Sequence, residues 1–257
     1  MCELLTIGTR CEVYYICDME CPKLIGKKLI DKNDPEVINC KYTNFILDVN
    51  FPKYHTVIND NDNIIIIYEY IKGNSLENEM YNLSNKDFYK IICKIVDKVI
   101  KITRQHFYYL NINKTNIILK NNEPYFIDFS SLFKPCDSLI NSNRLFGSKT
   151  NVPPEYSIEK RIILEKFDVF SIGLLLFEKT YQVNLFNVEN YYSLNCWFWC
   201  DIKKFHSRDN CLIKFMNNQN ERISEAMKYI IIKCLEFDFH KRIELEKLKM
   251  FLEINSS

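Results

Sequence analysis

Residues 109–129 constrain the fold more than any other stretch of this 257-residue chain. Two short runs rich in β-branched and aromatic residues, 117–119 and 125–129, flank a polar turn at 120–124, which predicts a β-hairpin. The hairpin would bring Asn116, which precedes the first run, close to Asp128, which lies near the end of the second. An amide oxygen and a carboxylate at the mouth of a loop suit a hard divalent cation such as Mg²⁺.

Length and charge limit the classes of protein to consider. The chain is long enough for one large domain or for two lobes that share an interface. Its 34 lysines and arginines against 33 acidic residues give a formal charge of +1, so we expect neither a nucleic acid nor an anionic membrane as partner. The longest apolar runs, 64–68 and 172–177, are far shorter than the roughly 18 residues of a membrane span.

The N-terminus and the cysteines predict an intracellular protein, cytoplasmic or nuclear. The first residues lack the basic and apolar segments of a secretory signal. The 11 cysteines are odd in number and scattered, which favours free thiols in a reducing compartment. Two pairs are spaced four apart, Cys17/Cys21 and Cys196/Cys200, but neither has the second pair that a zinc site needs, so we interpret them as buried thiols.

The pattern along the chain predicts strands first and helices later. Apolar and β-branched runs predict strands at 4–7, 12–17, 23–30 and 64–68. Asp34 followed by Pro35 marks a helix start, and we expect that helix to continue to about residue 49. Apolar residues at helical spacing then predict a long core helix over 84–105.

Residues 109–129 resemble the catalytic loop and the Asp-Phe-Gly segment of protein kinases, and similar markers follow in the family's order along nearly the whole chain. The resemblance implies an α+β, bilobal fold of one domain, with a small β-rich N-lobe (1–71) and a larger helical C-lobe (72–257). It also implies ATP and Mg²⁺ as ligands, with Asn116 and Asp128 binding the metal.

In the N-lobe the resemblance assigns nucleotide-binding roles to four residues. Gly8 and Val13 remain from the family's glycine-rich loop. Thr6 and Cys11 stand in place of its other two glycines. Gly26 would be the small residue against adenine and Lys28 the amine on the α- and β-phosphates, since period-2 alternation puts both on one face. Lys27 takes this role if the register is shifted by one residue.

The resemblance also places the adenine-binding linker and a missing ion pair. Tyr68 stands at the gatekeeper position, and Glu69, Tyr70 and Ile71 would offer backbone hydrogen bonds to adenine. Tyr42 occupies the position of the helix glutamate that pairs with the strand lysine in active kinases, so we expect that ion pair to be absent.

The C-terminal half carries the structural markers of the family. Residues 147–155 are similar to the end of the activation segment, with Gly147 and Pro154 among the matching residues. Asp168 would bind backbone amides of the catalytic loop, and Gly173 would permit close helix packing. Glu155 and Arg242 would form a buried ion pair.

The catalytic residues depart from the family pattern. The His-Arg-Asp motif is Tyr109-Leu110-Asn111 here, so an amide replaces the catalytic-base carboxylate. Asn113 stands where serine/threonine kinases have a phosphate-contacting lysine, although Lys114 is adjacent. Ser130 replaces the glycine after Asp128-Phe129, which restricts a backbone that often flips.

Three hypotheses follow from these departures. The preferred one is a catalytically impaired pseudokinase that binds ATP and Mg²⁺ and acts as a scaffold or allosteric regulator of protein partners, such as another kinase. The second is a weak serine/threonine kinase in which Asn111 still orients a hydroxyl of a protein substrate while Lys28 and Asp128 position the phosphates. The third is an interaction module that binds no nucleotide.

Overall fold

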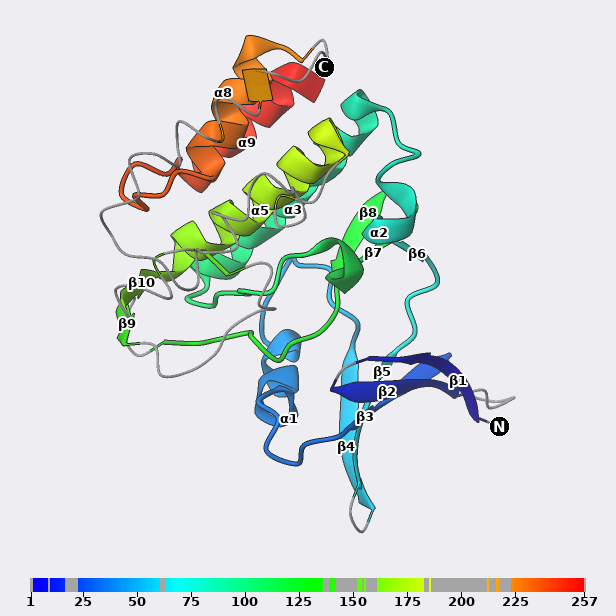
Figure 1. Cartoon of the computed structure of the whole chain (residues 1–257). Coiled ribbons are helices and arrows are strands. Elements are labelled where there is room, and N and C mark those ends of the chain that lie inside the picture. The colour runs from blue at the N-terminus through cyan, green and yellow to red at the C-terminus, as the bar shows by residue number, and fades with distance from the viewer. Residues whose placement is uncertain are drawn as a thin grey trace.

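The computed structural model shows a twisted antiparallel sheet followed by a mainly helical part (Figure 1). The residues that the structure describes are 2–8, 10–16, 23–60, 63–135, 139–141, 152–153, 155, 161–182, 185, 212, 216–217 and 223–256. The sheet has five strands in the order β1-β2-β3-β5-β4. Their bounds are β1 Cys2–Ile7, β2 Cys11–Ile16, β3 Leu24–Leu29, β4 Tyr54–Asp60 and β5 Asn63–Glu69.

The elements after the sheet include a second, smaller sheet. Its three strands, in the order β6-β7-β8, are Asn74–Ser75, Ile117–Lys120 and Glu123–Phe126, and the short strands β9 (Leu139–Asn141) and β10 (Arg161–Ile163) pair with each other. The helices are α2 Leu76–Glu79, α3 Asn85–Arg104, α5 Leu164–Tyr181, α8 Glu225–Cys234 and α9 Leu245–Ser256. This is the α+β, bilobal arrangement that the sequence predicts. Among the described residues, no helix is long and apolar enough to cross a membrane.

The predicted hairpin is confirmed as β7–β8. Ile117 pairs with Phe126 and Lys120 with Glu123, which leaves Asn121 and Asn122 as a two-residue turn. Both turn residues have positive φ, 54° and 60°, the conformation that a tight hairpin turn requires and that asparagine tolerates well.

Gly73 lets the chain pass close to this hairpin on its way from β5 to β6. A Cβ at this position would lie 2.2 Å from the carbonyl oxygen of Leu119, so no other residue fits without a backbone shift. Gly73 is therefore required by the packing of the chain against the hairpin.

Two long helices form the centre of the helical part. The predicted core helix is confirmed as α3, which begins at an N-cap, Ser84, whose side chain accepts a hydrogen bond from Asp87 N. Helix α5 is buried along almost its whole length. Its Gly173 faces α8, where a Cβ would lie 2.6 Å from the Cβ of Cys234, so close packing of the two helices depends on this glycine.

The helix expected over residues 34–49 is much shorter than predicted. Helix α1 spans only Glu36–Asn39 and continues as the 3₁₀ segment η1, Cys40–Asn44. Asp34 does support the start, because its Oδ1 accepts a hydrogen bond from Glu36 N at 2.9 Å. The segment is rich in β-branched residues and asparagine, which form helices poorly, and the Thr43 hydroxyl donates to the carbonyl of Cys40 at 2.7 Å.

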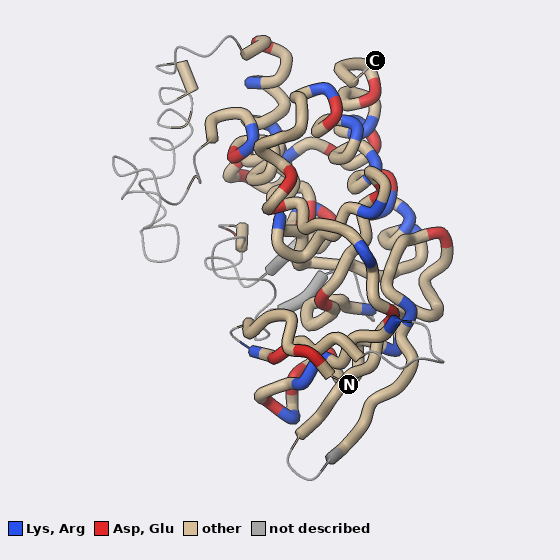
Figure 2. The backbone as a smooth tube through the Cα atoms, turned by 90° about the vertical axis from the view of Figure 1, so that its right-hand side faces the viewer, with Lys and Arg blue, Asp and Glu red and all other residues tan. Residues whose placement is uncertain are grey.

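Charges of both signs are distributed over both parts of the molecule. Figure 2 shows Lys and Arg interspersed with Asp and Glu along the described backbone of the sheet and of the helices. This distribution agrees with the near-zero net charge of the chain.

Candidate active site

The two adjacent lysines of β3 lie on opposite faces of the sheet. In the β2–β3 pairing, Lys27 is opposite Val13 and Lys28 is opposite Glu12. The face that carries Lys27 is the inner one, because Leu29 and Tyr68 on the same face belong to the main hydrophobic core. Val13 therefore lies on the inner face beside Lys27.

The expected roles of Lys28 and Gly26 do not agree with this geometry. Lys28 lies on the outer face, where its Nζ is 3.3 Å from Glu12. Gly26 shares that face, covered by Ile16 and Ile65, so neither can face a nucleotide on the inner side. Spacing from the glycine-rich loop cannot decide between adjacent lysines, because a one-residue shift of a strand exchanges its faces.

The ion pair that was expected to be absent is present. Lys27 Nζ donates to Glu36 Oε2 at 2.6 Å, and both side chains are buried, with 11% and 1% of their surface exposed. The prediction was wrong because it aligned the helix glutamate with Tyr42, whereas the first residue of the short helix α1 carries the carboxylate. Glu36 also accepts hydrogen bonds from Tyr68 Oη at 3.0 Å and from Phe129 N at 3.4 Å.

A second carboxylate, Asp128, lies beside this pair at 3.8 Å from Lys27 Nζ. Burial by itself would lower the pKa of Lys27, but Glu36 and Asp128 more than offset it and raise the pKa, so the ammonium stays charged. Burial likewise acts to raise the pKa of Asp128, yet Lys27 and the hydrogen bonds from Ser130 hold it below its usual value. Asp128 is therefore ionised at neutral pH.

Asp128 and Asn116 meet at the hairpin mouth, as the sequence predicts. Ile127 N donates to the Asn116 carbonyl at 2.9 Å, which brings the residues at the two ends of the hairpin together. Mg²⁺ is commonly held by one or two protein oxygens together with phosphate oxygens and water, so these residues suit the metal of a nucleotide complex. In the described part of the chain, no three His, Cys, Asp or Glu side chains cluster as a self-contained metal site.

The segment after β5 offers few free donors for adenine. The gatekeeper Tyr68 is buried on the inner face, and the N–H groups of Glu69 and Tyr70 donate to the carbonyls of Lys53 and Lys23, both at 2.9 Å. Adenine would have to bind through other backbone groups of residues 69–71, such as those of Ile71.

Tyr15 narrows the neighbouring part of the inner face. It lies opposite Ile25 in the β2–β3 pairing, and its ring meets that of Tyr70 edge to face, with centroids 5.1 Å apart. Ile25 thus stands on the inner face where the sequence led us to expect glycine. A larger residue there reduces the space above any bound base.

The loop between β1 and β2 is tied to α1. Gly8 N donates to Cys11 O at 2.8 Å and closes the turn. Arg10 extends from this turn to form an ion pair with Asp34, whose side chain also accepts a hydrogen bond from Glu36 N at the start of α1. A cation that the sequence did not single out therefore lies between the glycine-rich loop and the helix.

Asp168 holds the catalytic loop in the predicted manner. Its Oδ1 accepts a hydrogen bond from Leu110 N at 3.0 Å, and Leu110 has φ 55°, an unfavourable conformation for leucine that the bond helps to stabilise. Burial raises the pKa of Asp168 to about 8, although the N–H groups of Leu110 and Tyr109 oppose this effect.

Leu110 is anchored by apolar contacts. It is fully buried in a small cluster with Val152, Leu164 and Phe167. The arginine that the family often has at this position can bind a phosphorylated activation loop. Leu110 instead makes an apolar contact that does not depend on phosphorylation.

The amides of the catalytic loop bind one another. Asn111 is buried, and its main-chain carbonyl oxygen accepts hydrogen bonds from Asn113 Nδ2 at 3.3 Å and Asn116 Nδ2 at 3.2 Å. Asn113 Oδ1 caps the 3₁₀ segment η2 (Lys114–Asn116) by accepting from Thr115 N at 2.9 Å and Asn116 N at 3.0 Å. Asn113 therefore has a structural role at the position of the family's phosphate-contacting lysine.

Lys114 does not take over that role in this structure. Its Nζ donates to Glu178 on α5 at 2.5 Å and lies 3.7 Å from Glu77 on α2. Tyr81 also donates to Glu178 at 2.9 Å. Lys114 thus joins the catalytic loop to two helices of the helical part.

The predicted ion pair of the helical part is confirmed. Arg242 binds both carboxylate oxygens of Glu155, at 2.7 and 2.9 Å, and both side chains are almost completely buried. Other expected residues, Gly147, Pro154 and the paired cysteines at 17/21 and 196/200, lie outside the described residues.

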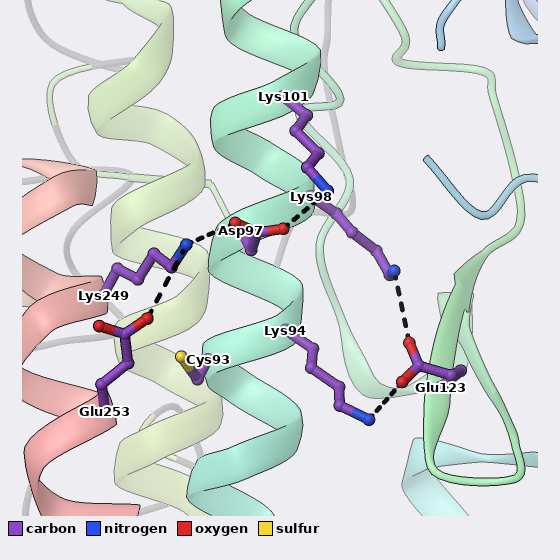
Figure 3. Close-up of a pocket in the computed structure, with 8 residues that line it drawn as sticks. All are labelled: Cys93, Lys94, Asp97, Lys98, Lys101, Glu123, Lys249 and Glu253. Atoms are coloured by element: carbon purple, nitrogen blue, oxygen red, sulfur yellow. Dashed lines mark hydrogen bonds and ion pairs between the residues drawn. The ribbon is translucent and has the colours of Figure 1, made fainter. Parts of the chain in front are cut away.

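A separate cavity of about 400 Å³ lies between α3, α9 and the hairpin (Figure 3). It is lined by four lysines and three acids: Lys94, Lys98, Lys101, Lys249, Asp97, Glu123 and Glu253. Each lysine has a carboxylate within 4 Å, as the dashed lines in Figure 3 indicate. We interpret the cluster as an ionic network that attaches α9 and β8 to α3.

Sequence reasoning found the residues of the loops and missed those of α1. Aligning the family's helix glutamate with Tyr42 left out Glu36, and no sequence pattern pointed to Asn39, which donates to the Phe129 carbonyl. The available signal was the helix start at Asp34-Pro35, which placed an acid in the first turn. Helix length was the missing information, since a one-turn helix leaves no later position for the glutamate.

Comparison with known proteins agrees with this architecture. The family model described as protein kinase domain matches residues 8–251. The chain therefore belongs to the protein kinase family.

Two curated relatives are serine/threonine kinases by name. The probable serine/threonine-protein kinase fnkE of Dictyostelium discoideum is 26% identical over 200 residues, 74% of this chain and 13% of the relative. The G-type lectin S-receptor-like serine/threonine-protein kinase SRK of Arabidopsis thaliana is 28% identical over 130 residues, 46% of this chain and 15% of the relative. The matched region thus spans only a small part of each relative's length.

Proposed function

We propose that this chain is a catalytically impaired protein kinase domain, a pseudokinase, that binds Mg-ATP and acts on protein partners as a scaffold or allosteric regulator. One observation carries the proposal. The Lys27–Glu36 pair is formed beside Asp128, whereas the position of the catalytic base holds the amide Asn111.

Nucleotide binding is supported by the charges on the inner face. Lys27 keeps its ammonium charged and has Asp128 within 3.8 Å, so it can bind phosphate oxygens while Glu36 fixes its position. Asp128 and Asn116 offer the oxygens for Mg²⁺, which neutralises the charge of the phosphates when bound. In this proposal the rest of the nucleotide would contact Val13, Gly8 and residues 68–71.

Impaired transfer is supported by the catalytic loop. An amide cannot accept the proton of a substrate hydroxyl, and general-base help is typically worth about 10²–10⁴ in rate. Asn113 caps η2 and Lys114 binds Glu178, so neither supplies a cation to the transferring phosphate in this arrangement. The residues that bind nucleotide are therefore better preserved than those that use it.

A weak serine/threonine kinase is the second candidate, favoured by the same Lys27–Glu36 pair. Phosphoryl transfer depends mainly on positioning and charge stabilisation, and the Asn111 side-chain oxygen, which accepts a hydrogen bond from Asn113 Nδ2 at 3.4 Å, would orient the hydroxyl. A nucleotide-free module is the third, favoured by the Tyr15–Tyr70 contact beside the expected adenine position. We expect each of the three to act inside the cell.

A protein partner is supported by exposed apolar residues around α1. Ile30, Ile38, Phe45 and Leu47, all close to α1 in the sequence, are each at least 65% exposed, and a partner that binds there would cover apolar side chains. Another kinase or a protein substrate that covered these residues would act on the helix that carries Glu36. Replacing Phe45 with Asp should then weaken partner binding without altering the response to Mg-ATP.

The first test is thermal unfolding with and without Mg-ATP. A ligand at 100 times its Kd adds about 2.7 kcal/mol, which for a domain of this size should raise Tm by about 5 °C or more. The shift should disappear in Lys27→Met and persist in Lys28→Met, a matched control on the opposite face. An unchanged Tm of the wild type at millimolar Mg-ATP would favour the nucleotide-free module.

The second test is phosphate transfer from radiolabelled Mg-ATP to the chain itself and to generic protein substrates. The pseudokinase proposal predicts no transfer by the wild type and measurable transfer by Asn111→Asp. Transfer by the wild type that is lost in Asp128→Asn would instead identify a weakly active kinase.

A further inference from the structure

Two side chains of helix α1 contact the main chain of Phe129 and Ser130. Asn39 Nδ2 donates to the carbonyls of Phe129 at 2.9 Å and Ser130 at 3.2 Å. Glu36 Oε1 accepts from Phe129 N at 3.4 Å. Because these helix residues are three apart, they lie on the same side of the single turn and reach the same segment.

The Phe129 side chain adds an apolar attachment. It is 1% exposed, and the centroid of its ring lies 5.3 Å from the ring centroid of Phe51 and 5.6 Å from that of Tyr68. Moving Phe129 would therefore open the core at the same time as it breaks the hydrogen bonds to α1.

Ser130 restricts the same backbone. Its N–H donates to Asp128 Oδ1 at 3.0 Å, and Asp128 has φ 70°, a conformation that this local bond helps to hold. Serine has fewer backbone conformations available than glycine, so the segment loses freedom where the family's motif has it. The contacts fix Asp128 with its other oxygen 3.8 Å from Lys27.

The burial of Asn39 makes an alternative arrangement costly. The residue is 4% exposed, so its amide would lose both acceptors if the segment moved away and no solvent replaced them. An unsatisfied buried donor costs more than the net contribution of the hydrogen bond that satisfied it.

We propose that Asn39 and Glu36 form a permanent clamp on Asp128-Phe129-Ser130, so that the carboxylate of Asp128 is held toward Lys27 in the absence of any ligand or partner. Asn39 is a positioning residue in this scheme, since it contacts the segment and not the ligand. The consequence for metal binding rests on the proposed function, whereas the clamp itself does not. A domain built in this way would present its nucleotide site ready formed and would not regulate it by moving this segment.

Hydrogen exchange of the free chain tests the clamp directly. We expect the peptide that covers residues 126–132 to be as well protected in the wild type as the β7–β8 hairpin. In Asn39→Leu, which keeps the size of the side chain and removes the donor, exchange in this peptide should accelerate on the order of tenfold or more, while α3 stays unchanged. Rapid exchange of this peptide in the wild type would overturn the proposal without any variant.

Asn44→Leu is the matched control. Asn44 lies in η1, is exposed and donates to Tyr54 O at 3.2 Å, so its replacement should leave exchange at 126–132 unchanged. Equal exchange in wild type and folded Asn39→Leu would contradict the clamp. If Asn39→Leu does not fold, Asn39→Ser removes the reach of the amide with less steric change and is judged by the same readout.

The metal consequence is measured separately. We expect the apparent Kd for Mg-ATP to be several-fold higher in folded Asn39→Leu than in Asn44→Leu. A wild type that shows slow exchange at 126–132 but no response to Mg-ATP would contradict the proposed function and leave the clamp intact. Fast exchange with a normal Mg-ATP response would do the reverse.

Discussion

Two buried ion pairs among the residues that the structure describes differ in what surrounds the cation. Arg242 in the helical part binds Glu155 with 0% and 2% of the side chains exposed, and its remaining N–H groups donate to the carbonyls of Lys166 and Glu236. Lys27 in the sheet has Glu36 at 2.6 Å, and Asp128 lies at 3.8 Å, beyond hydrogen-bond distance. Arg242 is thus satisfied by the protein, whereas Lys27 keeps donor capacity for a ligand.

This difference separates a pair that supports the fold from the pair at the proposed nucleotide site. A guanidinium with several fixed donors can be closed off completely by carboxylate and carbonyl oxygens. An ammonium held by one carboxylate and facing another remains able to bind phosphate. Burial of an ion pair therefore does not by itself indicate function, and the unused donor capacity of the cation is the more informative property.

The largest expected loss of stability comes from breaking the Arg242–Glu155 pair. Arg242→Met leaves Glu155 buried without its cation and should lower the free energy of unfolding by about 3–5 kcal/mol. Urea denaturation measures this loss. Arg104→Met removes an exposed arginine that lies 3.5 Å from Glu246 and should change stability by less than about 0.5 kcal/mol. Similar losses in both variants would contradict the contrast.

Breaking the Lys27–Glu36 pair should lower stability less than breaking the Arg242–Glu155 pair. It should, however, abolish ligand binding. Lys27→Met leaves Glu36 with the hydrogen bonds from Tyr68 and Phe129, so we expect a loss of about 2 kcal/mol. Isothermal titration with Mg-ATP should show no binding. Retained affinity in this variant would mean that another cation binds the phosphates.

Asp168 is a buried carboxyl whose pKa is shifted in the opposite direction to that of Asp128. The pKa of Asp168 is raised by burial to about 8, above the value of about 3.9 in an unfolded chain. The folded state therefore keeps a proton that the unfolded state releases, so this group's contribution to stability is full below pH 4 and is lost as the pH rises to 8.

Asp168→Asn removes that pH dependence. Urea denaturation from pH 5 to 8 should show stability of the wild type falling relative to Asp168→Asn, by at most about 1.4 kcal/mol per pH unit. Parallel curves for the two proteins would show that Asp168 is ionised in the folded state.

The gatekeeper hydroxyl should have a moderate effect. Tyr68→Phe removes the donor at 3.0 Å from Glu36 and keeps the ring against Phe129. We expect a loss of about 1 kcal/mol in urea denaturation. A neutral result would mean that Lys27 and Phe129 N satisfy Glu36 without the tyrosine.

The smallest effect should come from the lysine next to the site. Lys28 and Glu12 are 35% and 32% exposed in their side chains, so Lys28→Met should change stability by less than about 0.5 kcal/mol. Its apparent affinity for Mg-ATP should equal that of the wild type. Loss of binding in Lys28→Met would reverse the assignment of the two lysines.

Sequence patterns predicted the elements whose partners lie nearby along the chain or carry unmistakable chemistry. The β7–β8 hairpin follows from its two apolar runs and its asparagine turn. It brings Asn116 and Asp128 together because antiparallel pairing places the start of the first strand beside the end of the second. The Arg242–Glu155 pair and the bond from Leu110 to Asp168 are also as the family pattern implies.

By itself, the sequence determined the class of fold and the loss of the base carboxylate at Asn111, since both depend on which residue stands at a position in the chain. Only the tertiary structure decided that Lys27 faces the site and that Glu36 is its partner. Strand faces alternate with every residue, so the side on which a lysine lies is set by pairing with β2 and β5. The partner carboxylate is set by how far helix α1 continues, and that length depends on packing against the sheet and Phe129, contacts that no local pattern specifies.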